Sequence, residues 1–143
     1  MTKVGTISSL FYSPVNGRTT AKEFLLDTKG IVNDKHYDKD IDRSVLITSL
    51  ESYVLAKKYG IDAAYGALGE NLLIDYNPYH MPAGSRLKIG NVVLEISQPC
   101  TLCKSLTQID VRLPKLLKDD RGIFAKVIES GSIKEGDDIY LLN

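Results

Sequence analysis

The stretch Leu87-Lys88-Ile89-Gly90-Asn91-Val92-Val93-Leu94 contains the clearest indication of the fold. Two short apolar runs flank a Gly-Asn pair, which is the kind of two-residue turn that joins antiparallel strands. Apolar runs this short, rich in valine and isoleucine, are typical of strands. The stretch therefore predicts a β-hairpin with strands over Arg86–Ile89 and Val92–Ser97.

Similar apolar runs recur along the whole chain, with turn residues spread evenly between them. Regular short strands favour a barrel or a sandwich over an alternating βα arrangement. We therefore expect a mainly β protein, closed as a compact barrel, with one domain over residues 1–143. The other predicted strands are Val4–Leu10, Glu23–Leu26, Ser44–Ile47, Asn71–Ile74, Ile123–Ile128 and Asp138–Leu142.

Few helices are expected. The stretch Thr48-Ser49-Leu50-Glu51 matches the capping box, in which the threonine caps the helix and the glutamate reaches back to the cap. Gly60 supplies a stop, so this helix is predicted from about Ser49 to Tyr59. A second, shorter helix is predicted to begin at about Leu113.

Length and charge exclude several classes of protein. A chain of 143 residues with 43% hydrophobic residues can bury a core of its own. Its 18 Lys and Arg residues balance 18 Asp and Glu residues, which argues against non-specific nucleic-acid binding. No apolar run reaches the ~18 residues of a membrane span, and no signal peptide is evident. We expect no nucleic-acid or membrane partner and a cytoplasmic location, where thiols stay reduced.

The chain has two cysteines, Cys100 and Cys103, for which several interpretations are open. A zinc site would need His36 and His80 as further ligands, but their spacing matches no zinc finger, so no zinc is expected. A thioredoxin-like pair would need a βαβ unit, which is not predicted. The cysteines are then either two small buried side chains or one functional thiol at a strand end with an incidental neighbour.

Two polar segments are candidates for a site. In Gly66-Ala67-Leu68-Gly69-Glu70-Asn71-Leu72, adjacent Glu and Asn follow two glycines, and these side chains could bind a ligand or merely close a turn. The segment lacks the Lys-Ser/Thr ending of a phosphate loop. The charged stretch Asp34–Arg43 is typical of a solvated loop, and His36 within it carries little information alone.

Taken in order, these blocks resemble the MOSC domain, the module found at the C-terminus of molybdenum-cofactor sulfurases and in stand-alone bacterial proteins. The resemblance runs over essentially the whole chain, and it is the order and spacing of the blocks that make it specific. The matching blocks are Gly30–His36, Asp42–Leu46 with Glu51, Gly66–Leu72, Pro82–Gly90, Val93–Pro99, Cys103 with Leu106, Arg121–Ala125 and Gly131–Asp138.

The resemblance implies a strongly bent β-barrel, of the kind also found in pyruvate kinase, with a few short helices. It also implies that Cys103, the family's cysteine, carries sulfur as a persulfide or ligates the molybdenum of molybdopterin. Either role needs a thiolate, so nearby cations should lower the pKa of the thiol. Cys100 would be an auxiliary thiol.

Further site residues follow from the same resemblance. Arg43, Lys104 and Arg121 are the candidate cations, and they would also hold a cofactor phosphate. His36 would add a charge when protonated. Glu70 and Asn71 would contribute hydrogen bonds to the site. We expect Cys103, Asn71, Arg43 and Arg121 to line one cleft, with His36 at its rim.

The implied function is that of a sulfur carrier or a molybdenum-cofactor-binding module. Some relatives form part of a reductase of N-hydroxylated compounds. The implied partners are a cysteine desulfurase-type sulfur donor, in a pyridoxal phosphate-linked pathway, or an electron-transfer protein. The alternative is a binding or scaffold module that keeps the fold without the cofactor. Cys100 and Asp120 stand where the family usually has basic residues, and both changes make the pocket less cationic.

Overall fold

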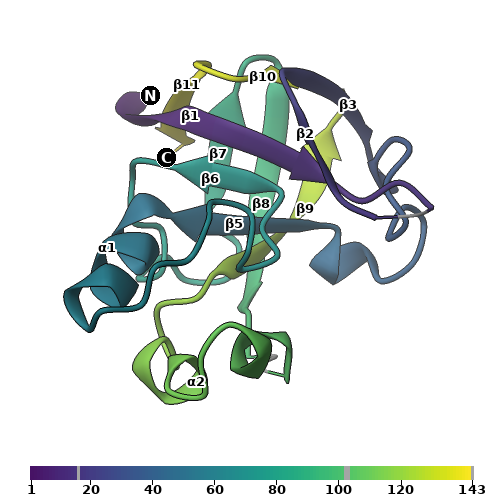
Figure 1. The fold of residues 1–143 in the computed structure, drawn as a ribbon. Coiled ribbons are helices and arrows are strands. Elements are labelled where there is room, and N and C mark those ends of the chain that lie inside the picture. Colours follow the sequence, from purple (N-terminus) through teal and green to yellow (C-terminus); the bar gives the residue numbers. More distant parts are fainter. Residues whose placement is uncertain (16, 102–103, 143) are drawn as a thin grey trace.

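The computed structural model describes residues 1–15, 17–101 and 104–142, and strands dominate it (Figure 1). Within these residues seven strands close into a barrel, in the order β1-β11-β7-β8-β9-β5-β6 and back to β1. All neighbours run antiparallel except β5 and β6, which are parallel. The mainly β barrel predicted from the sequence is confirmed. The barrel strands are β1 (Thr2–Tyr12), β5 (Val45–Ser49), β6 (Leu72–Ile74), β7 (Arg86–Ile89), β8 (Val92–Pro99), β9 (Ile123–Glu129) and β11 (Asp138–Leu142).

A smaller sheet lies against the barrel. It has the order β10-β3-β4, with β3 at Glu23–Asp27, β4 at Gly30–Ile31 and β10 at Gly131–Lys134. The three-residue β2 (Thr19–Ala21) pairs with the end of β1. Apart from β3, these are strands that the sequence analysis did not predict, and each is short.

The predicted hairpin is β7 and β8. Ile89 pairs with Val92 and Leu87 with Leu94, so the Gly-Asn pair forms the two-residue turn. Gly90 has φ +59°, a left-handed conformation that glycine adopts without the strain of a side chain.

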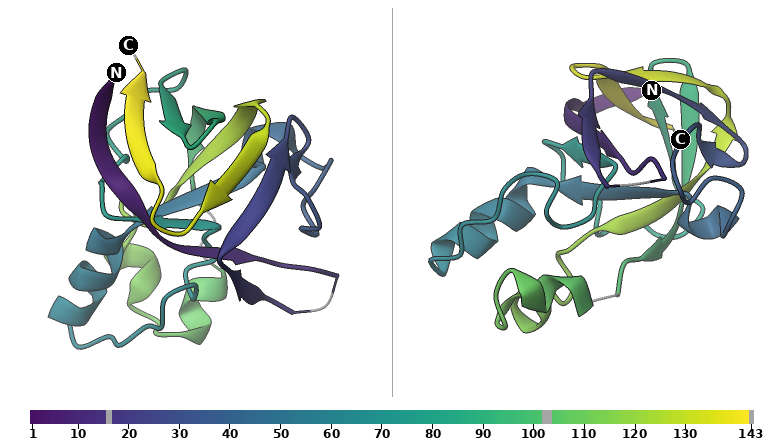
Figure 2. Two further views of the ribbon diagram at one scale, coloured as in Figure 1. Left: turned by 90° about the horizontal axis from the view of Figure 1, so that it is seen from above. Right: turned by 45° about the vertical axis from the view of Figure 1, so that its right-hand side comes forward.

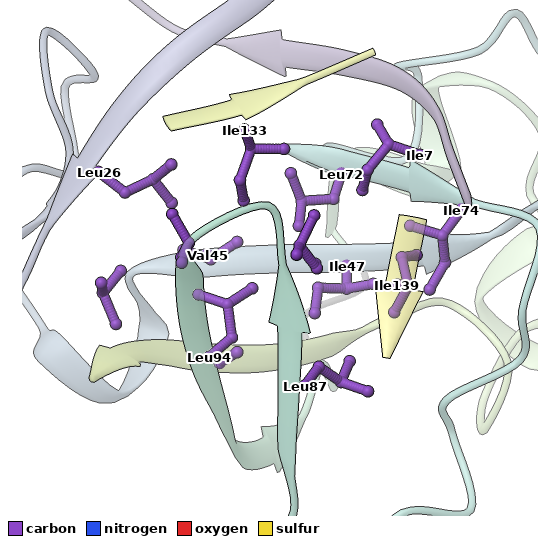
Figure 3. Close-up of a cluster of buried hydrophobic side chains, with 14 of the residues drawn as sticks. Ile7, Leu26, Val45, Ile47, Leu72, Ile74, Leu87, Leu94, Ile133 and Ile139 are labelled. Atoms are coloured by element: carbon purple, nitrogen blue, oxygen red, sulfur yellow. The ribbon is translucent and has the colours of Figure 1, made fainter. Parts of the chain in front are cut away.

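The barrel interior is filled by aliphatic side chains that come from all seven barrel strands (Figure 3). Alternate residues of β5, β6, β7, β8, β9 and β11 point inward, as the period of two predicts, whereas Ile7 and Leu10 of β1 reach the core on either side of a register shift. Leu26 and Ile133 of the smaller sheet join the same core, so that sheet packs against the barrel interior. The largest fully buried side chains include Ile7, Ile47, Leu72, Ile74, Leu87 and Leu94.

The first helix, α1 (Leu50–Lys58), is capped differently from the prediction. Ser49 is the cap, and its Oγ accepts a hydrogen bond from the Glu51 N–H at 3.1 Å. The Thr48 hydroxyl instead donates to the Arg121 carbonyl at 2.9 Å. The Glu51 carboxylate accepts from the Asn77 amide and not from a cap N–H. The capping-box assignment was therefore wrong, because β5 continues to Ser49.

The helices gather at one end of the barrel (Figure 2). There α1, α2 (Leu113–Leu116) and the 3₁₀ turn η2 (Lys104–Gln108) pack around a second buried cluster. No helix among the described residues is long and apolar enough to cross a membrane. The second cluster includes Tyr53, Leu68, Leu73, Leu106 and Leu113.

Candidate functional site

A cavity of about 660 Å³ lies where four segments of the chain meet. These are the segment before β2, the segment from residue 36 through the 3₁₀ turn η1 (Ile41–Arg43) into β5, the turn before β6, and the connection from β8 to β9, which contributes Cys100, Ser105 and Arg121 together with Phe124 of β9. The lining residues are Arg18, His36, Lys39, Asp40, Arg43, Ser44, Leu46, Gly69, Asn71, Cys100, Ser105, Arg121 and Phe124.

Positive charge is concentrated in this lining. Four of the described lining residues carry a permanent positive charge, and the described lining contains one carboxylate, that of Asp40. The whole chain has a net charge of zero, so the cavity is far more cationic than the chain average. A concave surface lined by one sign of charge attracts ligands of the opposite sign. The cations are Arg18, Lys39, Arg43 and Arg121.

Arg121 is the most deeply buried of these cations, with 6% of its surface exposed. Its Nε and Nη2 donate to the Leu68 carbonyl at 3.3 and 3.2 Å, and Nη2 also donates to the Ser105 hydroxyl at 3.2 Å. Its Nη1 is buried and has no hydrogen-bond partner among the described residues. A charged donor in this state leaves a favourable position for an anion.

Asn71 lines the cavity, but its amide already binds the backbone. Its Oδ1 accepts from the Leu46 N–H at 2.9 Å, and its Nδ2 donates to the Phe11 carbonyl at 3.2 Å. The side chain thus ties β5 to β1 beside the cavity. These two hydrogen bonds give Asn71 a structural role at the edge of the cavity.

Glu70 is fully buried and is absent from the described lining of the cavity. Its Oε2 accepts from the Tyr53 hydroxyl at 2.6 Å and from the Gly66 N–H at 3.1 Å. Burial raises the pKa of this carboxyl, with the hydrogen bonds opposing the shift. Of the two roles that the sequence left open for Glu70, the geometry corresponds to closing the turn.

One wall of the cavity is apolar. Leu46, Cys100 and Phe124 form a small buried cluster there. The Arg43 guanidinium lies over the Phe124 ring at 5.7 Å, and its Nε is 3.8 Å from Asp40 Oδ2. A cationic side beside an apolar wall suits a ligand that joins an anionic group to a flat apolar body.

His36 stands at the edge of the cavity, with 62% of its side chain exposed. Its Nδ1 lies 3.2 Å from Oδ2 of Asp34. Asp34 is buried and also accepts from the Ser13 and His36 N–H groups. The prediction of a solvated loop over Asp34–Arg43 is therefore wrong at Asp34, which fastens this loop to the end of β1.

Several cavity residues were missed by the sequence analysis, among them Arg18, Lys39 and Ser105. Arg18 and Lys39 lie in polar stretches where no spacing marks them, and Ser105 follows the cysteines without a motif of its own. Only the tertiary fold brings these residues together. Arg18 also lies outside every block of the family resemblance.

Cys103, the predicted reactive thiol, lies outside the described residues, and so does the side chain of Lys104. Their roles stay predictions. Cys100 lines the cavity with 4% of its surface exposed, and its N–H donates to the Gly122 carbonyl at 3.0 Å. Within the described part of the chain, no group of three or more His, Cys, Asp or Glu side chains could hold a metal ion.

Comparison with known proteins gives one family and several solved structures of the same fold. The family description of the MOSC domain matches residues 27–140. The YuaD protein from Bacillus subtilis has 18% identity and a TM-score of 0.81, over 95% of this chain and 94% of that one. YiiM from Geobacillus stearothermophilus has 20% identity and a TM-score of 0.78, over 97% and 75%. YiiM from Escherichia coli has 19% identity and a TM-score of 0.71, over 96% and 70%. No curated protein matches the sequence.

Proposed function

Because the chain belongs to the MOSC domain family, we propose that it is a sulfur carrier or a molybdenum-cofactor-binding protein that uses the Cys103 thiolate. The observation that carries the proposal is the buried Arg121 Nη1, which lacks a partner among the described residues. A buried charged donor without a partner costs free energy. A ligand phosphate or another oxyanion would remove that cost through a charge-assisted hydrogen bond.

Two features of the cavity support an anionic pterin cofactor as the ligand. Arg121 would bind its phosphate, while Leu46 and Phe124 would pack against its ring system and exclude water. Asp34 orients the His36 ring through Nδ1, so that a protonated His36 would add charge at the rim. When bound, the cofactor supplies the redox chemistry of molybdenum, which no side chain can provide.

Cys103 is the residue proposed to ligate the metal or to carry sulfur. Both roles require the thiolate, because the thiolate is the nucleophile and the soft ligand. In the sequence, Cys103 lies between Cys100 and Ser105, which both line the cavity. The cavity cations would favour loss of the thiol proton at neutral pH. A sulfur carrier would need a cysteine desulfurase-type donor, and a reductase of N-hydroxylated compounds would need an electron-transfer partner.

The test is the molybdenum content of protein purified from a cofactor-replete host, together with cyanide-releasable sulfur as a measure of persulfide. We expect metal or persulfide in the wild type and neither in Cys103→Ser. If the ligand is the cofactor, Arg121→Gln should lower metal content at least ~10-fold, the worth of a charged hydrogen bond. Arg86→Gln is the matched control, because Arg86 pairs with Glu95 on the barrel surface. A wild type without metal or persulfide contradicts the proposal.

A binding module without a cofactor is the second candidate. Asp40 favours it, because its carboxylate offsets part of the Arg43 charge inside the cavity. Cys100 favours it as well, because a neutral thiol occupies a position that is usually basic in the family. A wild-type protein that binds inorganic phosphate in the cavity, yet carries neither molybdenum nor persulfide, would support this second function.

A further inference from the structure

We infer that the buried Glu70 is a positioning residue of the anion site, and that with Tyr53 it holds the turn whose carbonyls orient Arg18 and Arg121. This inference rests on the proposed function, because it assumes that the two arginines face an anionic ligand. It assigns a role to a carboxylate that is absent from the cavity lining.

The turn over residues 66–70 presents its carbonyl groups to both arginines. The Gly66 carbonyl accepts from Arg18 Nε at 3.2 Å, and the Glu70 carbonyl accepts from Arg18 Nη2. The Leu68 carbonyl, between them, accepts from Nε and Nη2 of Arg121. Three carbonyls at alternate positions of one turn thus hold two guanidinium groups that come from distant parts of the chain.

The amide groups of the same turn bind the buried pair on its other side. The Gly66 N–H donates to the Tyr53 hydroxyl oxygen at 3.0 Å and to Glu70 Oε2 at 3.1 Å. The Leu68 N–H donates to the Tyr53 hydroxyl oxygen at 3.3 Å. Gly66 and Gly69 have φ +91° and +89°, a left-handed conformation that lets successive peptide groups face opposite ways. The direction of the turn's carbonyl groups therefore depends on the Tyr53 hydroxyl and the Glu70 carboxylate, which accept hydrogen bonds from the amides of the turn.

This arrangement keeps the arginine charges available. Among the described residues, neither Arg18 nor Arg121 forms an ion pair, since both are held by neutral carbonyls. In the part of the chain that the structure describes, the Glu70 carboxylate forms no hydrogen bond or ion pair with either guanidinium group. It accepts from the Tyr53 O–H and the Gly66 N–H instead, and its charge acts on Arg18 only through space. A carboxylate in direct contact would occupy the guanidinium donors that an anionic ligand needs, whereas a carboxylate that binds the amides of the turn leaves those donors free.

For this role, residue 70 must accept hydrogen bonds from Tyr53 and Gly66, and it need not carry a charge. Glu70→Gln keeps an oxygen that can accept from Tyr53 and Gly66, so the turn should survive. Glu70→Leu has nearly the same size and no acceptor, so the turn should relax and the arginines should move. Tyr53→Phe removes the hydroxyl that accepts from two amides of the turn, and it tests the same inference without changing Glu70.

The experiment measures the affinity for inorganic phosphate by calorimetry at pH 7, with the arginine Nε–Hε resonances as a second readout. We expect Glu70→Leu and Tyr53→Phe each to weaken binding about 5-fold or more and to shift the Arg121 resonance, the effect of roughly one lost hydrogen bond. Glu70→Gln should remain within about 2-fold of the wild type, because its oxygen still accepts. Ile139→Val, a buried core change of comparable cost, controls for lost stability and should leave both readouts unchanged.

The outcomes separate this inference from the proposed function. If Arg121→Gln abolishes phosphate binding while Glu70→Leu and Tyr53→Phe bind as the wild type does, the positioning role is overturned and the anion site stands. If the wild type binds no phosphate, the anion site fails, and the arginine resonances still decide whether Glu70 orients Arg121. Should Glu70→Leu fail to fold, Tyr53→Phe carries the test.

Discussion

The protonation of the buried Glu70 side chain affects the stability of the fold. Burial raises its folded-state pKa above the ordinary value near 4.5. A carboxyl shifted upward binds more protons in the folded state, so its contribution to stability is full below the unfolded pKa and is lost as pH rises through the folded pKa. We expect Glu70→Gln, which cannot ionise, to gain stability relative to the wild type as pH rises above 4.5.

Urea unfolding of both proteins across a pH series measures this difference. Other carboxyls titrate equally in the two proteins, so the difference isolates residue 70. A difference that stays constant from acid to neutral pH would show that Glu70 does not titrate with folding.

The two thiols are predicted to differ in reactivity. Cys100 is buried against Leu46 and Phe124, so reagents should reach it slowly. We expect Cys100→Ser to keep a fast thiol whose titration midpoint lies below the ~8.5 of free cysteine. Alkylation with a limiting reagent across pH measures the rates in wild type, Cys100→Ser and Cys103→Ser. Retention of the fast thiol in Cys103→Ser would reverse the assignment.

At the scale of single residues, the sequence predicted part of the candidate site. The family resemblance selected Arg43, Asn71, Arg121 and His36, and the fold brings all four to one cavity. Their functional roles stay predictions. Arg18 was not predictable, because only the tertiary fold carries it to the turn before β6.

The cap of α1 gives a test at the scale of one element. Ser49→Ala removes the acceptor for the Glu51 N–H and should lower the free energy of unfolding by about 1 kcal/mol. Glu51→Ala should cost less than ~0.5 kcal/mol, because that side chain binds Asn77 at the surface and no cap N–H. Thermal or urea unfolding of both variants measures the costs. If Glu51→Ala lowered the free energy of unfolding more than Ser49→Ala does, the capping box that starts at Thr48 would be the correct assignment.

Two glycines have the same left-handed backbone conformation but differ in the space around them, so alanine substitutions at both distinguish backbone strain from steric clash. Gly66 and Gly84 have φ +91° and +92°. A Cβ at Gly66 would lie 2.8 Å from the Phe11 ring, whereas one at Gly84 meets nothing within 4 Å. We expect Gly84→Ala to cost about 1 kcal/mol from strain alone, and Gly66→Ala about 1–3 kcal/mol more from the clash. Equal losses in urea unfolding would mean that Phe11 moves aside freely.

Elements were predictable where the local pattern was strong. The strands of the closed barrel follow the predicted runs because their residues are β-branched or leucine-rich and bounded by turn residues. The short strands β2 and β10 have the sequences Thr-Thr-Ala and Gly-Ser-Ile-Lys, which are too short and polar for such a pattern. Their pairing partners, and not their own residues, make them strands.

The molecule as a whole is closed by strands from opposite ends of the chain. β1 pairs with β11, with Thr2 opposite Leu141 and Thr6 opposite Asp138, so the first and last strands lie side by side (Figure 2). No local pattern could specify this pairing, because the two strands are separated by nearly the whole chain. The hydrophobic face of each strand selects the partner, since only the closed barrel buries Ile7 and Ile139 together.

Barrel closure predicts that β1 and β11 unfold only with the whole molecule. Opening their seam would expose the fully buried Ile139 and leave two open sheet edges, so a local opening is as costly as global unfolding. We expect native-state hydrogen exchange to give the amides of paired β1 and β11 residues the same opening free energy as the β8 and β9 centre. The short strand β2, which is exposed and has one neighbour, should exchange through a much cheaper local opening. Exchange of the β11 amides at the rate of the β2 amides would mean that the barrel opens at this seam in the native state.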